Sequence, residues 1–313
     1  MKKSWIRWIL LLLVAVALVI APYFTRRYTV FVLYLICLNI SLAQSWNLLG
    51  GYTGLISLGH ASFLGIGAYT TGMMITHFGV PFPVATIVGG LMAAAFSAIM
   101  AIPTFRFRGI YFAIGTLILA EALRIWMINW EFTGGAQGVH FPPDAGPSLR
   151  GFYYIMLGVA AGTTTMMALI LRSQLGLGLR AIRDNEDSAQ NMGVNTFKTK
   201  LYAFLISAFI AGITGGIHAT KMSAIEPYSI FSAAWTFATV NIVIIGGIGT
   251  MIGPILGSVF ITYLSEYLAE YHTFHLVITG IILILIIRFV PSGIWGTIGN
   301  TRIVKSLIRR FMA

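Results

Sequence analysis

The amino-acid sequence predicts an all-α fold, a polytopic transmembrane helical bundle of about 8–10 spans. Of its 313 residues, 58% are hydrophobic and only 9% are charged, whereas roughly 25% of a soluble domain is charged. Apolar runs long enough to cross a bilayer recur along the chain, and the basic residues gather in clusters between them. This composition excludes an ordinary soluble enzyme, a disordered chain and a nucleic-acid-binding module.

Roughly ten apolar segments are candidate spans, since a span needs about 20 apolar residues. The first follows Lys2, Lys3 and Arg7 and is similar to a signal peptide in pattern. No clear small-x-small cleavage site follows the apolar run, where Pro22, Tyr23 and Phe24 come next, so we expect an uncleaved helix. The candidate spans are 8–24, 28–46, 61–78, 83–104, 110–130, 151–171, 200–220, 232–249, 252–270 and 274–290.

The positions of the basic residues predict the orientation of the spans. Cytoplasmic loops of membrane proteins carry an excess of lysine and arginine. With the N-terminus inside, the alternation puts 131–150 and 221–231 outside and both termini in the cytoplasm. Arg26 and Arg27, on a short outer turn, are the exception. The clusters that fall inside are Lys2 to Arg7, Arg106 with Arg108, 172–200 and 288–310.

The same alternation suggests an internal repeat. Spans two to five begin outside, and spans seven to ten begin inside. Two blocks of four spans with opposite orientation are the arrangement of an inverted repeat. The sequence similarity between the blocks is faint, so the repeat is a hypothesis that superposition about an in-plane axis would test.

Glycine pairs at predicted span ends are candidates for broken helices that line a pathway. Polar side chains in apolar surroundings are further candidates, because they are costly in a membrane unless paired. The alternative is that the glycines only allow close helix packing and that the polar groups make interhelical hydrogen bonds. The candidates are Asn47, Gly50, Gly51, His60, Gly246 and Gly247.

The segment 172–199 is the one long polar stretch on the predicted inner side, and its chemistry predicts two short helices. Leu177 to Arg183 forms the first, and Asp184 or Asn185 caps the second by accepting from free backbone N–H groups. Gly193 is suited to end it in the left-handed conformation. A compact amphipathic element of this kind suits docking to a soluble partner; the alternative is a solvated loop. The expected apolar contacts come from Leu179, Ile182, Ala189, Met192 and Val194.

Four stretches of the sequence carry a resemblance to a known family. The run SQLGLGLRAIRDNEDSAQNMGVN at 173–195 resembles the coupling loop of ABC importer permeases, in particular those of branched-chain amino acid importers of the LivM/LivH type. The runs SWNLLGGYTGLISLGHASF at 45–63, FTGGAQG at 132–138 and GGIGTMIGPILG at 246–257 are similar to further motifs of that family. The resemblance extends in consistent order from about residue 30 to 300.

The resemblance implies one permease domain, 1–313, with an ATPase-coupling loop at 172–199 and a cytoplasmic tail at 291–313. It implies a bacterial inner-membrane protein that is not itself an enzyme and binds no cofactor; a separate cytoplasmic ABC ATPase uses the ATP. Further implied partners are a second related permease, a periplasmic solute-binding protein, the amino acid substrate and membrane lipid. The Gly-x-x-x-x-Gly-Lys-Ser/Thr loop of ATPases is missing from the sequence.

The resemblance also implies roles for particular residues. Leu177 and Gln137 depart from the pattern that we expect in the family, and Gln137 weakens any inference about substrate preference. The outer-loop glycine motif adds Thr133, Gly134 and Gly135 to the pathway candidates. The residues implied in coupling to the ATPase are Gly176, Arg180, Ala181, Asp184 and Gly193.

Two other interpretations stay open. The same type of importer serves urea, amides or another small solute, and an ion-coupled secondary transporter is the rival from a different class. The rival needs acids within the membrane, for which Glu121 and Glu266 are candidates, although a local Glu121–Arg124 ion pair is the simpler expectation. His272 and His275 lack further ligands, so we expect no metal site.

Overall fold

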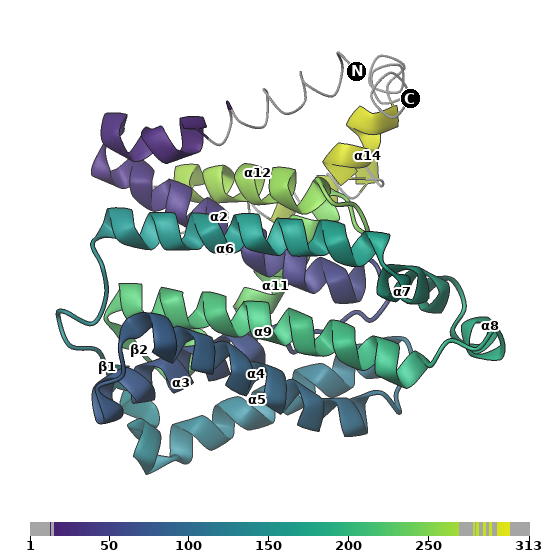
Figure 1. Ribbon diagram of the computed structural model, residues 1–313, viewed down its shortest axis with the longest axis horizontal. Coiled ribbons are helices and arrows are strands. Elements are labelled where there is room, and N and C mark those ends of the chain that lie inside the picture. Colours follow the sequence, from purple (N-terminus) through teal and green to yellow (C-terminus); the bar gives the residue numbers. More distant parts are fainter. Residues whose placement is uncertain are drawn as a thin grey trace.

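The computed structural model describes residues 13, 16–268, 278, 280–281, 284–285, 288–289 and 293–300. Almost every element among them is helical (Figure 1). In chain order the helices and strands are α2 (Arg27–Gly50), α3 (His60–Phe78), α4 (Phe82–Thr104), α5 (Ile110–Asn129), η1 (Glu131–Thr133), η2 (Gly135–Gln137), β1 (Val139–His140), α6 (Leu149–Arg172), α7 (Gln174–Asp184), α8 (Glu186–Asn191), α9 (Thr196–Met222), β2 (Ala224–Ile225), α10 (Pro227–Ile230), α11 (Ala233–Gly246), α12 (Gly253–Leu268) and α14 (Gly293–Asn300).

Six helices are long and apolar enough to cross a membrane: α2, α4, α5, α6, α9 and the α10–α11 pair. They confirm the polytopic helical bundle. Helix α3, with 19 residues, corresponds to the third expected span, 61–78, and the 16 residues of α12 cover most of the ninth, 252–270. Residues 8–12, 14 and 15 of the expected span 8–24 lie outside the described residues, and so does most of the expected span 274–290. The inverted repeat stays a prediction.

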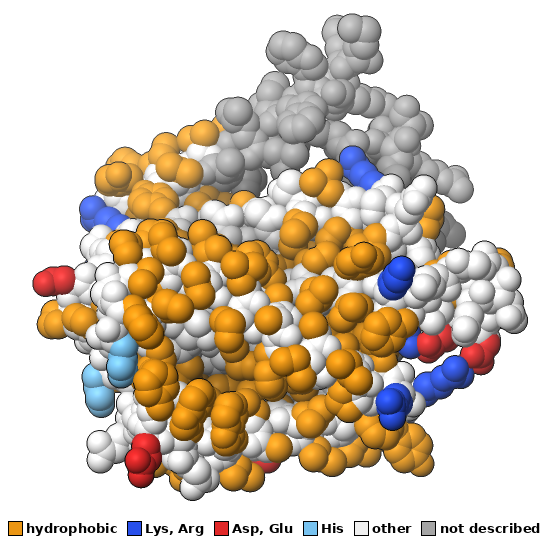
Figure 2. All heavy atoms as spheres, turned by 60° about the horizontal axis from the view of Figure 1, so that its bottom comes forward, with side chains coloured by type: hydrophobic (Ala, Val, Ile, Leu, Met, Phe, Trp, Pro, Cys, Tyr) orange, Lys and Arg blue, Asp and Glu red, His pale blue; other side chains and the backbone are white. Residues whose placement is uncertain are grey.

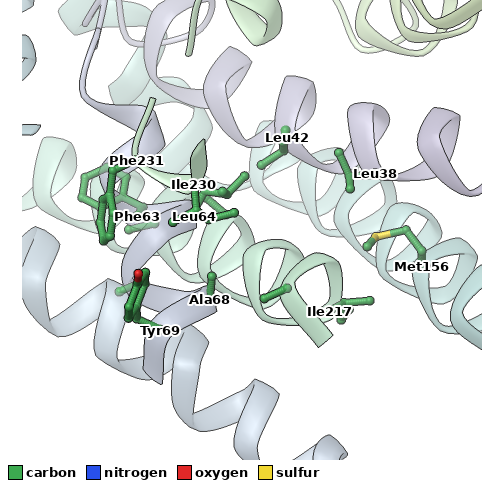
Figure 3. Packing of buried hydrophobic residues seen from close by; sticks show 14 of the residues in the cluster. Leu38, Leu42, Phe63, Leu64, Ala68, Tyr69, Met156, Ile217, Ile230 and Phe231 are labelled. Carbon is green, nitrogen blue, oxygen red and sulfur yellow. The ribbon is translucent and has the colours of Figure 1, made fainter. Parts of the chain in front are cut away.

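The core of the bundle lies around α2 and α9, two thirds of whose apolar stretch is buried. Figure 3 shows buried side chains of α2, α3, α6 and α9 converging there. Small residues let the helices approach: a Cβ on Gly67 of α3 would lie 2.1 Å from the carbonyl oxygen of Gly212 in α9. Close approach of this kind drives helix association in lipid, where no hydrophobic force between helices exists.

The two ends of the bundle differ in structure (Figure 1). At one end, which we name the β end, β1 pairs antiparallel with β2, Val139 opposite Ile225. At the other, the α7 end, Asp187 of α8 forms an ion pair with Arg108 from the α4–α5 turn. The expected outer segments thus meet each other, and so do two expected inner segments. This agrees with the predicted alternation, although which end faces the cytoplasm stays a prediction.

The face over α4 and α5 is apolar between these ends. Figure 2 shows a continuous field of hydrophobic side chains there, with charged side chains at its margins. Ile99 and Ile118 are 65% and 61% exposed. In water such a surface would be unfavourable, whereas lipid tails solvate it.

Candidate functional site

The residues 173–195 fold as the two predicted helices, α7 and α8, which we name the two-helix element. Helix α7 follows α6 after a single residue, Ser173. This sharp connection depends on Gly176, since a Cβ there would lie 2.4 Å from the carbonyl oxygen of Ile170. Because Gly176 is buried, its role is to allow the turn between α6 and α7.

Helix α8 begins and ends by the expected chemistry. The side chain of Asn185, and not that of Asp184, caps it by accepting from the backbone N–H of Ser188 at 2.8 Å. Glu186 and Asp187 lie in its first turn, where the helix dipole favours acids. Gly193 follows with φ of +88°, a conformation that glycine adopts without strain.

Buried apolar residues and ion pairs attach the element to the bundle. Leu179, Ile182 and Ala189 are buried, as predicted. Glu186 forms an ion pair with Lys200 of α9, whose side chain is almost wholly buried. On the exposed side, Arg108 Nη2 lies 3.1 Å from Asp187 Oδ1, and this hydrogen bond raises the pKa of Arg108.

The outer surface of the element is a mixture of charged and apolar side chains. Arg180 and Asp184 are exposed, and Ala181 is half-buried beside them. The expectation that Met192 packs inward is wrong: it lies just after α8 ends and is 74% exposed. Leu177 is also 64% exposed. Leu177 and Met192 therefore present apolar side chains on the exposed surface of the element.

The two-helix element contacts the turn that follows α2. Arg183 Nη1 donates to the carbonyl oxygen of Gly51 at 3.2 Å. Tyr52, in the same turn, is buried, which raises the pKa of its hydroxyl to about 12 although Arg180 and Arg183 act in the opposite direction. The sequence did not indicate a role for Arg183, because nothing distinguishes it from the other charged residues of this polar segment.

The turn that follows α2 also contacts the loop between α11 and α12. Asn47 is fully buried; its Oδ1 accepts from the Gly249 N–H at 2.9 Å, and its Nδ2 donates to the Thr250 carbonyl at 2.8 Å. A Cβ on Gly51 would lie 2.6 Å from the Gly249 nitrogen. We name Asn47 and residues 50–54 together with 246–253 the glycine joint. The joint therefore connects α2, α11 and α12 to the two-helix element.

Both predicted glycine pairs lie in this joint. Helix α11 ends at Gly246, and Gly247 has φ of +126°. A Cβ on Gly246 would lie 2.0 Å from the Gly253 carbonyl, and one on Gly50 would overlap the ring of Trp46 at 2.3 Å. The glycines thus allow backbone-to-backbone and backbone-to-ring contact, as the packing interpretation predicts.

His60 lies among interhelical hydrogen bonds. Its Nε2 is 2.9 Å from Ser45 Oγ of α2, and Ser207 of α9 donates to the Ser45 carbonyl at 2.8 Å. The His60 Nδ1 atom has no hydrogen-bond partner among the described residues. The interhelical interpretation accounts for most of the surroundings of this residue.

The outer-loop candidates do not join this group. Thr133, Gly134 and Gly135 lie between α5 and β1, at the β end (Figure 1). Thr133 Oγ1 donates to the Trp130 carbonyl at 2.8 Å, and both glycines have positive φ. The nine pathway candidates therefore divide between the glycine joint, the α2–α3 contact at His60 and the opposite end of the bundle.

Within the described residues, no three His, Cys, Asp or Glu side chains come close enough to hold a metal ion. His272 and His275 lie outside those residues. The fold defines a class: a multi-pass membrane protein with a two-helix element at one end of its bundle.

The chain belongs to the family described as the branched-chain amino acid transport system / permease component, whose profile matches residues 28–287. This confirms the resemblance of the four motifs, and a permease component is a transport subunit and not itself an enzyme. No solved structure matches.

Several relatives are also named as permease proteins. The high-affinity branched-chain amino acid transport system permease protein LivM of Escherichia coli K12 is 29% identical, covering 87% of this chain and 71% of its own. A probable LivM of Methanocaldococcus jannaschii is 24% identical over 67% of each chain. The autoinducer 2 import system permease protein LsrC of Salmonella typhimurium is 25% identical over 68% of this chain and 62% of its own.

Proposed function

We propose that this chain is the permease subunit of an ATP-driven importer that carries branched-chain amino acids across the bacterial inner membrane. A separate cytoplasmic ATPase docks on the two-helix element and supplies the energy. The observation that carries the proposal is the hydrogen-bonded connection from Arg183 through Gly51 and Asn47 to Gly249 and Thr250. It joins a docking surface to the ends of three membrane helices.

This connection supports a mechanical role for the glycine joint. When ATP closes the ATPase dimer, the two-helix element moves with it. The element carries Gly51 through Arg183, and Gly51 lies against Gly249, so α2, α11 and α12 move together at this end. Closely packed backbones transmit displacement because they have no side-chain freedom to absorb it. Alternate opening of the two bundle ends follows from such tilting.

The remaining assignments rest on the family and on the surface. Arg180, Ala181 and Asp184 contact the ATPase, with Leu177 and Met192 as apolar contacts; Gly176 and Gly193 shape the element behind them. A solute-binding protein delivers the amino acid at the β end, and a second related permease completes the transmembrane unit. The relative named for autoinducer 2 import supports the alternative that this bundle carries another small solute.

The ion-coupled alternative has less support. Of its two candidate acids, Glu121 forms an ion pair with Arg124 one turn along α5, and Glu266 accepts from the Tyr28 hydroxyl at 2.8 Å. Both carboxylates thus have partners within the chain, whereas a coupling acid must exchange its partner for the ion. An ion-driven mechanism also leaves the exposed surface of the two-helix element without a purpose.

The test is Ala181→Trp, which adds an indole to the docking surface. We expect the variant to insert in the membrane but to lose co-purification with the ATPase and ATP-dependent L-leucine uptake in proteoliposomes. The control is Lys198→Trp, which adds the same group at the exposed start of α9 and should retain both. Normal uptake by Ala181→Trp would contradict docking at this surface, and leucine uptake that needs an ion gradient in place of ATP would favour the alternative.

A further inference from the structure

A cavity opens at the β end of the bundle, away from the glycine joint. Its volume is about 680 Å³, within the range of sites for small molecules. The start of α2, the loop 142–148, the start of α6 and the last turn of α9 surround it. Its apolar walls include Phe31, Phe152 and Pro142, and its polar lining includes the hydroxyls of Ser148 and Thr220.

Two cations, Arg27 and Lys221, line this cavity, and no aspartate or glutamate does. Neither cation forms an ion pair with another described residue. Tyr28, which also lines the cavity, donates to Glu266, and this bond occupies one carboxylate oxygen of that acid. Among the residues that the structure describes, the cavity therefore presents positive charge to a ligand without an acid in its lining.

The ammonium of Lys221 is held in place by aromatic faces. Its Nζ lies 4.1 Å from the ring centroid of Phe31 and 5.9 Å from that of Tyr34. Cation–π contacts stabilise an ammonium but do not neutralise it, and they leave its N–H groups available on the other side. Lys221 is thus held at the cavity wall with its positive charge not neutralised.

The position of these charges is itself unusual. Arg27 belongs to the basic pair that breaks the predicted positive-inside pattern, and Lys221 also lies on the predicted outer side. Arg27 lines a second, adjoining cavity of about 410 Å³ together with Arg150. Three basic side chains thus gather where topology alone favours few, and a topological signal does not explain them.

We propose that the 680 Å³ cavity binds the carboxylate of a small organic solute with an apolar body. Lys221 and Arg27 hold the carboxylate, and the aromatic and proline walls receive the apolar part. The identity of that solute as a branched-chain amino acid rests on the proposed function. In that setting the cavity is the first site on the permease that the amino acid occupies after the delivering protein releases it.

A ligand pair that differs only in charge tests this inference directly. Isovalerate and isovaleramide have the same branched shape, but only isovalerate carries a carboxylate. Using the purified full chain in phosphatidylcholine nanodiscs, we expect isovalerate and L-leucine to raise the melting temperature and isovaleramide not to. Lys221→Gln and Arg27→Gln should each weaken isovalerate binding at least about ten-fold, since a hydrogen bond to a charged group is lost.

Matched variants separate this role from effects on folding. Lys221→Arg keeps the cation and should retain most of the response. Arg26→Gln removes an exposed arginine from the same turn that does not line the cavity, and it should leave isovalerate binding unchanged. The assay contains neither ATPase nor transport, so its result does not depend on whether the chain couples to an ATPase.

Three results would overturn the inference. The first is equal stabilisation by isovalerate and isovaleramide. The second is a Lys221→Gln variant that changes only the response to phosphatidylglycerol in the nanodisc, which would assign the cavity to a lipid headgroup. The third is a variant that weakens binding of the delivering protein while isovalerate binding is intact, which would make the cations a protein-docking surface.

Discussion

Removal of the Asn47 side chain should uncouple ATP hydrolysis from transport. In Asn47→Ala, the Gly249 N–H loses its acceptor and the Thr250 carbonyl loses its donor. Losing a partner costs about 1–3 kcal/mol for a buried group, and both loop residues are half-buried, so water replaces part of the loss. We expect about 2 kcal/mol for the pair of bonds, which shifts the contact equilibrium of the glycine joint by roughly thirty-fold.

The assay is the number of leucine molecules imported per ATP hydrolysed, measured in proteoliposomes that contain the complete importer. Because Arg183 and the docking surface are unchanged, we expect the ATPase to assemble and hydrolyse ATP while the import ratio falls several-fold. Asn39→Ala is the matched control: Asn39 lies on the same helix and donates to Thr262 of α12 at 2.8 Å, but outside the joint. A normal ratio in Asn47→Ala, or an equal fall in Asn39→Ala, would refute the reasoning.

Two further predictions concern the local structure. Asn185→Ala removes the cap of α8 and should cost about 1 kcal/mol; proteolysis within 186–191 should quicken, whereas Gln190→Ala, on the exposed side of the same helix, should leave it unchanged. Gly67→Val introduces a branched side chain where even a Cβ would lie 2.1 Å from the Gly212 carbonyl. Overpacking typically costs about 1–3 kcal/mol, occasionally more, so the melting temperature should fall. The same change at Gly158, where a Cβ meets nothing within 4 Å, should have little effect, and equal melting temperatures for the two variants would contradict the packing argument.

The parts of the site that were predictable are those set by local chemistry. Asn185 caps a helix because its side chain reaches the N–H of Ser188 three residues on, and Gly193 ends the element because glycine tolerates positive φ. Both interactions lie within a short run of sequence, so that run alone is sufficient to predict them. The prediction for Met192 was wrong because apolar character alone does not indicate whether a residue just after a helix end is buried or exposed.

The contacts that make up the glycine joint were not predictable in the same way. Arg183 and Gly51 are 132 residues apart, and Asn47 and Gly249 are 202 apart. No periodicity in either segment indicates its partner. The glycine pairs and Asn47 were recognised singly as unusual, but their meeting is a property of helix packing. Likewise, the charges around the β-end cavity come from separate helices.

Helix α5 is attached at its two ends and lightly held between them. Just before α5, Arg108 forms an ion pair with Asp187 of α8. After α5, the chain continues to β1, which pairs with β2. Only a third of its apolar stretch is buried. Contacts at both ends restrict the movement of α5 along its axis more than its bending. If α8 moves as proposed, its ion pair with Arg108 gives α5 a connection to that movement that is separate from the glycine joint.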